Sequence, residues 1–426
     1  MYRFIAAVCV VALAAAAAGP AQSRGRAPIV VDTTNELRDA LVEAEAGQRI
    51  LVRAGTYAVD GPLAVPDGVT LEGEGVMLGG DLPTGFEPGT EATIVALSTL
   101  EGDLLTLGDN TVVRRLLLQD AHDRVGNVVA VLSRGPNSSV SASIVECEIV
   151  NPDPLDQAGV DGPTGGGVVA LTRNPAREQS PGPDTGAAVN LQIERSILRA
   201  PGRALFAMNF APNGRVEVAL TENVVEGPLE AIGGISRPDE VSGATTTIHS
   251  RSNLYTPPAP SGFGWMIGGG SSPPFGIAGS EETSSNHLDV DSADDRIEGA
   301  LVGIDAFAGR RRNAATGLSS DNTAQLQLRD LDIQTTGADA ADLRLRAAES
   351  SGEFLPGHRN TLSVDIRDST GSGPRANLYA HVFGPLLPEN RGEGNRLEFV
   401  GTLAAFEESN AGIDPAPPAS FFTADA

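Results

Sequence analysis

The chain has 426 residues and a formal net charge of −25 at pH 7, with a pI of about 4.5. So acidic a surface disfavours nucleic acid and anionic membranes as partners, because both repel negative charge. All 30 basic residues are arginine, which excludes Schiff-base lysines, lysine general bases and Walker-type phosphate loops.

Residues 1–23 have the pattern of a secretory signal peptide. Arg3 supplies a weak positive start, Phe4 to Ala18 form an apolar run, and small residues follow. The run is too short to span a bilayer comfortably, and no later segment is apolar enough to do so. We therefore expect a secreted protein, extracellular or periplasmic, without a membrane span. Cleavage would leave Cys147 as the one cysteine, so no internal disulfide could form.

The mature chain is expected to open with a short strand at 29–31 and an amphipathic helix. Thr33 and Glu36 have the spacing of a capping box, and Gly47 would supply a left-handed stop. One apolar stripe follows helical spacing and comprises Leu37, Ala40, Leu41 and Ala44. A helix at this place can cover the apolar end and the unpaired edges of a stacked strand array.

A six-residue pattern of the form apolar–x–x–small–x–apolar then recurs along the chain. Its copies begin at Val113, Ile144, Ile193, Leu220 and Leu328, so the successive gaps are 31, 49, 27 and 108 residues. Gaps near 30 favour one repeated unit, and the larger gaps favour long loops or degenerate copies. Short strands separated by turns at this period predict a solenoid of parallel strands. The small residues Cys147, Ser196 and Asn223 would stack there as an internal ladder at a bend.

The N-terminal part of the chain carries a family resemblance. The expected helix is followed by a strand and turn at 45–57 and by a strand ending in glycines at 66–75. This order resembles the opening of right-handed parallel β-helix proteins of the pectin-lyase-like superfamily, which includes polysaccharide lyases of the chondroitinase B and alginate lyase type. The resemblance implies an all-β fold, a right-handed parallel β-helix (solenoid) with an N-terminal amphipathic helix cap. It also implies extracellular polysaccharide as the partner.

The expected organisation is a signal peptide at 1–23, a β-helix domain at 24–405 and an acidic, Pro-rich tail at 406–426. Insertions at the turns of a solenoid can build a binding wall. Stretches rich in Gly, Pro, Asp or Ser predict such loop insertions at 151–167, 173–187 and 256–290.

Charged residues follow several repeat strands and are candidates for substrate binding. Asp120, His122, Arg199 and Arg203 would project from the same side of successive coils and suit an acidic or hydroxylated sugar chain, because Arg binds carboxylates in a fork. The ordinary preference of Asp, Asn and Pro for turns explains such residues equally well. Trp265, the only tryptophan, would either stack on a sugar ring or pin the 256–290 loop to the coil.

Acidic turn residues are candidates for metal binding. Asp153, Asp156 and Asp161 offer the carboxylate oxygens that Ca²⁺ prefers, so Ca²⁺ is the one cofactor that the sequence suggests. A second acidic stretch, at 289–295, resembles a Ca²⁺ loop only loosely, because the EF-hand glycine and spacing are missing. A solvated acidic turn is the alternative there.

Candidate catalytic residues follow from the resemblance alone. Pectate lyases of this fold carry an Arg-x-Pro-x-x-Arg signature whose first Arg is assigned as the base. In this chain, Arg173 opens a similar segment, but Arg177 comes one residue early. The Lys/Arg pair of the alginate lyase type is absent, because the chain has no Lys. Two classes of function remain open, namely a polysaccharide lyase or glycosidase and a non-catalytic structural or adhesive surface protein.

Overall fold

The computed structural model describes the chain from residue 27 to residue 403 with internal gaps. The described ranges are 27–121, 126–152, 166–172, 185–236, 240–258, 262–271, 283–311, 319–337, 340–350, 358–371, 377–382 and 395–403. Within them, strands dominate and nearly all strand pairings are parallel.

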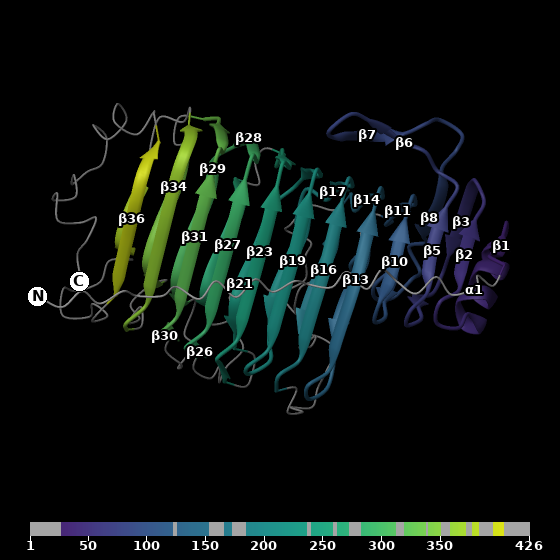
Figure 1. Cartoon of the computed structure of the whole chain (residues 1–426), viewed down its shortest axis with the longest axis horizontal. Helices are drawn as coiled ribbons and strands as arrows, with labels where there is room; N and C mark the ends of the chain where they lie inside the picture. Colours follow the sequence, from purple (N-terminus) through teal and green to yellow (C-terminus); the bar gives the residue numbers. More distant parts are fainter. Residues whose placement is uncertain are drawn as a thin grey trace, which may run out of the picture.

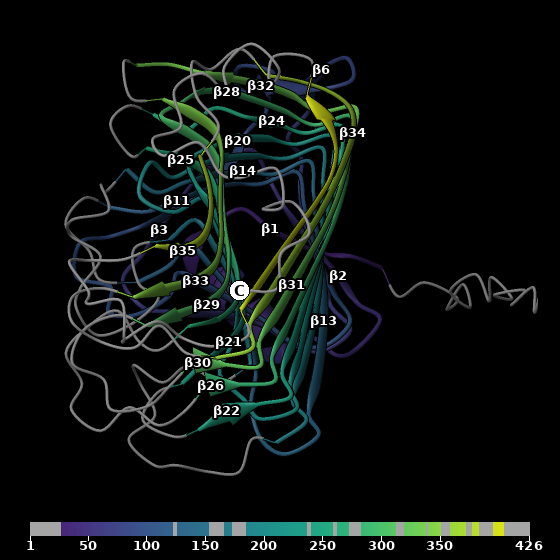
Figure 2. The same ribbon diagram turned by 90° about the vertical axis from the view of Figure 1, so that its left-hand side faces the viewer.

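The described chain winds as a right-handed parallel β-helix with three long faces, here called sheets A, B and C. Strands of successive coils lie side by side along the long axis (Figure 1), and the view along that axis shows the faces around one interior (Figure 2). One coil pairs with the next on all three faces, as β13 with β16, β14 with β17 and β12 with β15. The fold expected from the repeat is confirmed.

Sheets A and B are continuous, because β34 pairs with strands of both. Sheet A comprises β1 (Ile29–Val31), β2 (Arg49–Val52), β5 (Thr70–Gly73), β10 (Thr111–Arg114), β13 (Ser139–Val145), β16 (Ala188–Glu194), β19 (Arg215–Thr221), β23 (Thr245–Arg251), β27 (His287–Ala293), β31 (Thr323–Arg329), β34 (Thr361–Gly371) and β36 (Arg396–Leu403). Sheet B comprises β3 (Gly55–Val59), β8 (Ala92–Ala96), β11 (Leu117–Gln119), β14 (Glu148–Val150), β17 (Ile197–Arg199), β20 (Val224–Glu226), β24 (Leu254–Tyr255), β28 (Arg296–Ala300) and β32 (Asp332–Thr335).

Sheet C forms the third face, and two small sheets lie outside the three faces. Sheet C comprises β4 (Leu63–Val65), β9 (Leu105–Leu107), β12 (Val129–Ser133), β15 (Val168–Thr172), β18 (Leu205–Asn209), β21 (Leu229–Ile235), β25 (Phe263–Ser271), β29 (Val302–Arg311), β33 (Ala341–Ser350) and β35 (Asn377–Val382). The small sheets are the parallel trio β22 (Val241–Ser242), β26 (Thr283–Ser284) and β30 (Ser319–Ser320), and the antiparallel hairpin of β6 (Met77–Gly79) and β7 (Pro83–Phe86).

The α-helix α1 (Thr34–Glu43) covers the first coil, as expected. Thr33 is its N-cap and accepts a hydrogen bond from the Glu36 backbone N–H. The helix buries Leu37 and two neighbours of its apolar stripe against the first strands. One detail differs from the expectation, because α1 ends at Glu43 with Ala44 as its C-cap, and Gly47, with φ +83°, instead shapes the turn that leads into β2.

The six-residue repeat is the corner between sheets A and B. One residue in the left-handed region joins the two strands, and the following residue points inward; Glu146 and Cys147 are one such pair. The Cys147 N–H donates to Ser196 Oγ at 3.1 Å, and the Ser196 N–H donates to Asn223 Oδ1 at 2.8 Å. The predicted ladder of small residues at a bend is therefore confirmed.

The same corner ladder continues into coils that the pattern did not reveal. Asn223 donates to Asn253, whose N–H donates to Asp295 Oδ1 at 2.7 Å. In these coils the six-residue pattern begins at Ser250 and Ser292, so its first position is polar where the pattern requires an apolar residue. They fill the apparent gap between the copies at Leu220 and Leu328.

The predicted loop insertion at 256–290 is wrong in part. Residues Phe263–Ser271 form β25, a full strand of sheet C that pairs with β21 and β29. Its Gly-rich sequence hid it, because glycines normally weaken a strand. Most of the other two predicted insertions, the signal peptide and the tail lie outside the described residues.

From β12 to β21, every residue of the sheet C strands is buried, on both faces of the sheet. Besides the main core, a second apolar cluster lies on its outer side and includes Leu132, Leu171, Phe206, Met208 and Phe307. Near it, the buried Arg346 forms an ion pair with the buried Asp305. Sheet A therefore offers the more accessible face of the coil. No helix among the described residues is long and apolar enough to cross a membrane.

Candidate functional site

The outer face of sheet A is a regular polar surface. Along β16 the side chains of Val189, Leu191 and Ile193 are buried, while Asn190 and Gln192 point outward. Because the pairing is parallel and in register, outward residues of successive strands form straight rows with a spacing of about 4.8 Å. A linear ligand lying across the strands would follow one such row and meet one side chain of each strand in turn.

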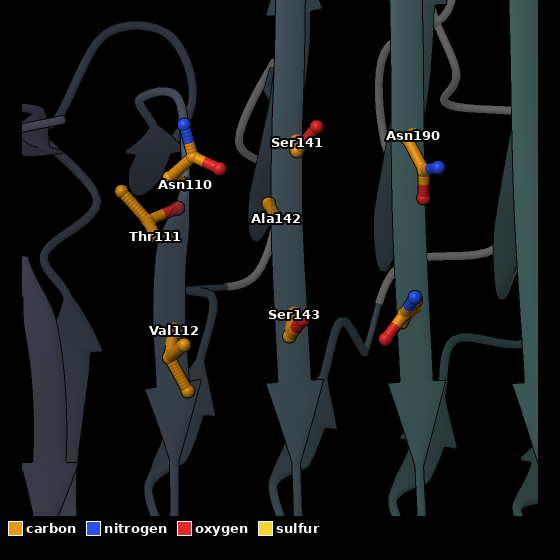
Figure 3. A pocket seen from close by; sticks show the side chains of 8 residues that line it. Asn110, Thr111, Val112, Ser141, Ala142, Ser143 and Asn190 are labelled. Atoms are coloured by element: carbon orange, nitrogen blue, oxygen red, sulfur yellow. The ribbon is translucent and has the colours of Figure 1, made fainter. Parts of the chain in front are cut away.

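A shallow hollow of about 280 Å³ lies on this face over β10, β13 and β16. Figure 3 shows Asn110, Ser141 and Asn190 at one level of three neighbouring strands, with Val112 and Ser143 further along. The lining is completed by Thr111, Ala142 and Gln192. The outward polar groups are amides and hydroxyls, which both donate and accept hydrogen bonds.

Local sequence explains why the hollow forms at this place. β10 has four residues and its neighbour β13 has seven, so residues 139–141 at the start of β13 pair with no residue of β10. Asn110 stands there in the left-handed region with φ 54°. The carboxylate of Asp109 fixes the rim, because it accepts hydrogen bonds from the Ser141 N–H at 2.8 Å and from Asn110 Nδ2 at 2.7 Å.

An arginine cluster borders the hollow on the side of the N-terminal coils. Glu72, with only 3% of its side chain exposed, forms ion pairs with Arg49, Arg114 and Arg115. Arg114 points outward two residues beyond Val112 on β10. Arg49 lies in the same row as Val112, with Thr70 of β5 between them. The three guanidinium groups and one carboxylate carry a local net charge of +2, within a chain of net charge −25.

The cluster differs from the ion-paired arginines further along sheet A. Arg251 pairs with Asp291, and Arg367 pairs with Asp365, one acid to one base. Glu146, which lies next to Arg115 along the A–B corner, is paired instead with Arg195. Among the described residues, Glu72 is the one carboxylate that forms an ion pair with any of the three clustered arginines.

The described substrate-binding candidates do not form one site. Asp120 is buried at the end of β11 and accepts a hydrogen bond from the Ala121 N–H. Arg199 lies on the outside of sheet B, between Glu148 and Glu226. Arg203 stacks on Phe206 at 4.4 Å and lies 3.6 Å from Glu230. The expectation that these residues project together is wrong, because a corner residue and a strand residue of the same coil face different ways.

The assignment of Trp265 to substrate binding is also wrong. Its side chain is fully buried in the interior of the coil, in edge-to-face contact with Tyr255 at a ring separation of 5.2 Å. It is a core residue of β25 and presents no surface on which a sugar ring could stack. An indole in this place adds a large apolar contact area to the core.

The remaining candidates lie outside the described residues. These are His122, the proposed Ca²⁺ ligands Asp153, Asp156 and Asp161, and the proposed catalytic pair Arg173 and Arg177. Within the described ranges, no group of three or more His, Cys, Asp or Glu side chains is arranged to hold a metal ion.

The acidic stretch at 289–295 is part of the coil rather than a Ca²⁺ loop. Asp289 lies 2.9 Å from His287, and Asp291 pairs with Arg251. Asp295 is buried in the corner ladder, where burial raises the pKa of its carboxyl. Ser292 and Asn253 donate hydrogen bonds to it.

Sequence reasoning missed both the hollow and the arginine cluster. It searched the turns for titratable residues, whereas the hollow is built from neutral side chains in the middle of strands. The alternation at 140–144 and 189–193 did contain the signal, because every second residue there is Ser, Asn or Gln. The cluster combines residues from three different coils, which no local pattern reveals.

No protein-family model matches the sequence, and no curated protein matches it either. The fold is a right-handed parallel β-helix. A polygalacturonase from Erwinia carotovora ssp. carotovora is similar with 13% identity and a TM-score of 0.32, over 88% of this chain and 98% of the polygalacturonase. The alginate lyase AlyGC of family PL6 is similar with 10% identity and a TM-score of 0.16, over 88% of this chain and 81% of the lyase. The pairing of the strands, and not these comparisons, establishes the fold.

Proposed function

We propose that this protein is exported and binds an extracellular polysaccharide in the hollow on the outer face of sheet A, over β10, β13 and β16. The hollow lined by Asn110, Ser141, Asn190 and Gln192 carries this proposal. Sugar hydroxyls are recognised by groups that both donate and accept hydrogen bonds, and the hollow presents such groups at strand spacing. The signal-like segment at 1–23 supports export.

The lining favours binding over catalysis at this place. The lining residues that the structure describes include no carboxylate, imidazole, thiol or phenol, and the carboxylate at the rim, Asp109, already accepts hydrogen bonds from the Ser141 N–H and Asn110 Nδ2. General acid–base chemistry on a glycosidic bond requires such groups within hydrogen-bonding reach. These groups therefore favour binding of carbohydrate in the hollow. Cleavage of the polysaccharide by a lyase or glycosidase reaction is assayed separately from binding.

Binding to a panel of neutral and acidic extracellular polysaccharides tests the proposal, with affinity electrophoresis as the measurement. The double variant Asn190→Ala/Gln192→Ala removes two polar groups of the hollow. We expect its affinity to fall about thirtyfold, because two hydrogen bonds that each contribute on the order of 1 kcal/mol are lost.

The matched control is Gln325→Ala/Gln327→Ala. These residues lie on β31 in the same two rows as Asn190 and Gln192, four strands further along sheet A. The control should bind as the unchanged protein does. Binding of no polysaccharide in the panel, or equal losses in the two double variants, would remove the proposal. New unsaturated uronates or reducing ends would add catalysis to it.

A further inference from the structure

The arginine cluster beside the hollow is more than an internal ion pair. The side chains of Arg49, Arg114 and Arg115 are 45%, 39% and 35% exposed, so each of them is partly open to solvent although it contacts Glu72. Each guanidinium has five N–H donors, whereas the buried carboxylate of Glu72 has only two oxygen atoms. Unused donors therefore remain at the surface.

The geometry of the cluster selects the shape of a ligand. Arg49 approaches from the strand before Glu72, Arg114 from the strand after it, and Arg115 from the A–B corner. A planar carboxylate presents two oxygens in one plane, and Glu72 already uses both of its oxygens to hold the three arginines from the buried side. A tetrahedral oxyanion presents oxygens in several directions and can accept hydrogen bonds from three arginines at once.

We propose that Arg49, Arg114 and Arg115, held by Glu72, form an anion site for a tetrahedral oxyanion, and that its ligand is a sulfate ester on the polysaccharide that the hollow binds. The proposal rests on the proposed function for the polymer but not for the site itself. The chain as a whole repels polyanions, so attraction at this place comes from the local charge of +2.

Glu72 has two effects in this site. It orders the three arginines, because a buried carboxylate with three partners fixes their side chains. It also cancels one positive charge, which lowers the affinity for the ligand. Glu72→Gln keeps a hydrogen-bond acceptor and raises the local charge from +2 to +3, and should therefore strengthen anion binding if the arginines keep their places.

Three polymers with one backbone separate the contributions, namely dextran, carboxymethyl dextran and dextran sulfate, at equal degree of substitution and equal ionic strength. We expect dextran sulfate to bind at least about tenfold more tightly than carboxymethyl dextran. Free inorganic sulfate should compete with dextran sulfate. Carboxymethyl dextran bound as tightly as dextran sulfate would overturn the sulfate assignment.

The variants test the residues. Arg114→Gln should weaken the binding of dextran sulfate about tenfold, because a charge-assisted contact is lost. Arg251→Gln is the control, since Arg251 lies in the same row of sheet A, four strands away, and has its own acid. Equal effects of these two variants would contradict the site.

Two further measurements make the outcome independent of folding and of the hollow. Thermal unfolding identifies a variant that loses structure, and Arg49→Gln then replaces Arg114→Gln. The variant Asn190→Ala/Gln192→Ala should keep inorganic sulfate binding while losing affinity for unsubstituted polysaccharide. A loss of affinity for unsubstituted polysaccharide alone, in the Asn190→Ala/Gln192→Ala variant, reports on the proposed function. A loss of inorganic sulfate binding alone, in Arg114→Gln, reports on the anion site.

Discussion

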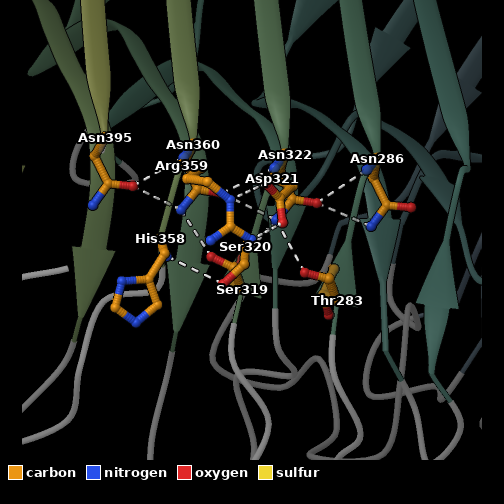
Figure 4. Close-up of polar contacts among 10 residues, drawn as sticks. All are labelled: Thr283, Asn286, Ser319, Ser320, Asp321, Asn322, His358, Arg359, Asn360 and Asn395. Atoms are coloured by element: carbon orange, nitrogen blue, oxygen red, sulfur yellow. Dashed lines mark hydrogen bonds and ion pairs between the residues drawn. The ribbon is translucent and has the colours of Figure 1, made fainter. Parts of the chain in front are cut away.

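Gly270 on β25 lies directly against the side chain of Asn322, and a methyl group on Gly270 would come within 2.4 Å of Asn322 Oδ1. Gly234 has the same relationship to Asn286, and Gly309 to Asn360. Figure 4 shows Asn286, Asn322, Asn360 and Asn395 as a row, one from each of four coils, at the corner between sheets C and A. Sheet C therefore carries glycine where the buried amides need the space.

Gly270→Ala should destabilise the protein by about 2 kcal/mol, because the added methyl group overpacks a buried, hydrogen-bonded amide. Denaturant unfolding measures this change. The control is Gly61→Ala, at a position where a Cβ meets no atom within 4 Å, and its effect should stay within about 0.5 kcal/mol. Equal stability of the two variants would show that the amide row yields at no cost.

Asn322→Ala should destabilise the protein by about 3 kcal/mol, because several buried groups lose their partners together. Asn322 Oδ1 accepts from the backbone N–H and the side chain of Asn286, both at 3.1 Å, and its Nδ2 donates to the Thr283 carbonyl. Gln325→Ala, on the exposed side of the same coil, is the comparison and should be nearly neutral. A loss below about 1 kcal/mol for Asn322→Ala would mean that water replaces the amide.

Asp295→Asn should stabilise the protein at pH 7, and the gain should shrink towards pH 4. Burial raises the pKa of Asp295 above its ordinary value of 3.8, so the unfolded chain releases this proton at lower pH than the folded chain. Ionisation therefore lowers stability as the pH rises from about 3.8 through the folded-state pKa. Asparagine avoids that charge and keeps an oxygen that can accept from Asn253.

Urea unfolding of both proteins at the two pH values measures the difference. The exposed neighbour, Asp294→Asn, is the control, and this substitution should change the free energy of unfolding little because the side chain is exposed. A gain from Asp295→Asn that is larger at pH 4 than at pH 7 would contradict the assignment of burial as the main cause.

Cys147 should be inert to thiol reagents in the folded protein. Burial raises the pKa of its thiol to about 12, so the reactive thiolate is scarce at pH 8. In a Cys9→Ser variant, labelling by a chromogenic disulfide should be negligible in native buffer and complete in guanidinium chloride. Rapid labelling without denaturant would show that the corner ladder opens locally.

The sequence contained enough to predict the coil but not its full regularity. The corner repeat was visible where an apolar residue opens it, as at Ile144 and Ile193. It was hidden at Ser250, whose hydroxyl contacts the Tyr255 hydroxyl inside the core, and at Ser292, which donates to Asp295. A buried pair of hydrogen-bonded polar residues can replace an apolar contact at this corner. A hydrophobicity pattern cannot distinguish such a buried polar residue from one at the surface.

The candidate site was harder to predict for a different physical reason. Its parts come from strands far apart in sequence, and Glu72, Arg114 and Arg49 become neighbours only when three coils stack in register. Charged turn residues and Trp265 were the predicted candidates. Arg199, however, is neutralised by Glu148 and Glu226, and Trp265 belongs to the core. Residue type alone does not show which charges are already neutralised.

The corner between sheets A and B sets how such a molecule can be lengthened. In seven coils, from β10–β11 to β31–β32, two residues connect the strands at this corner, the first in the left-handed region and the second facing inward. The two ends of any stretch cut at that corner are thus interchangeable in geometry. Whole coils could be duplicated or removed there as modules, and a binding face of chosen length could be assembled without redesigning a single joint.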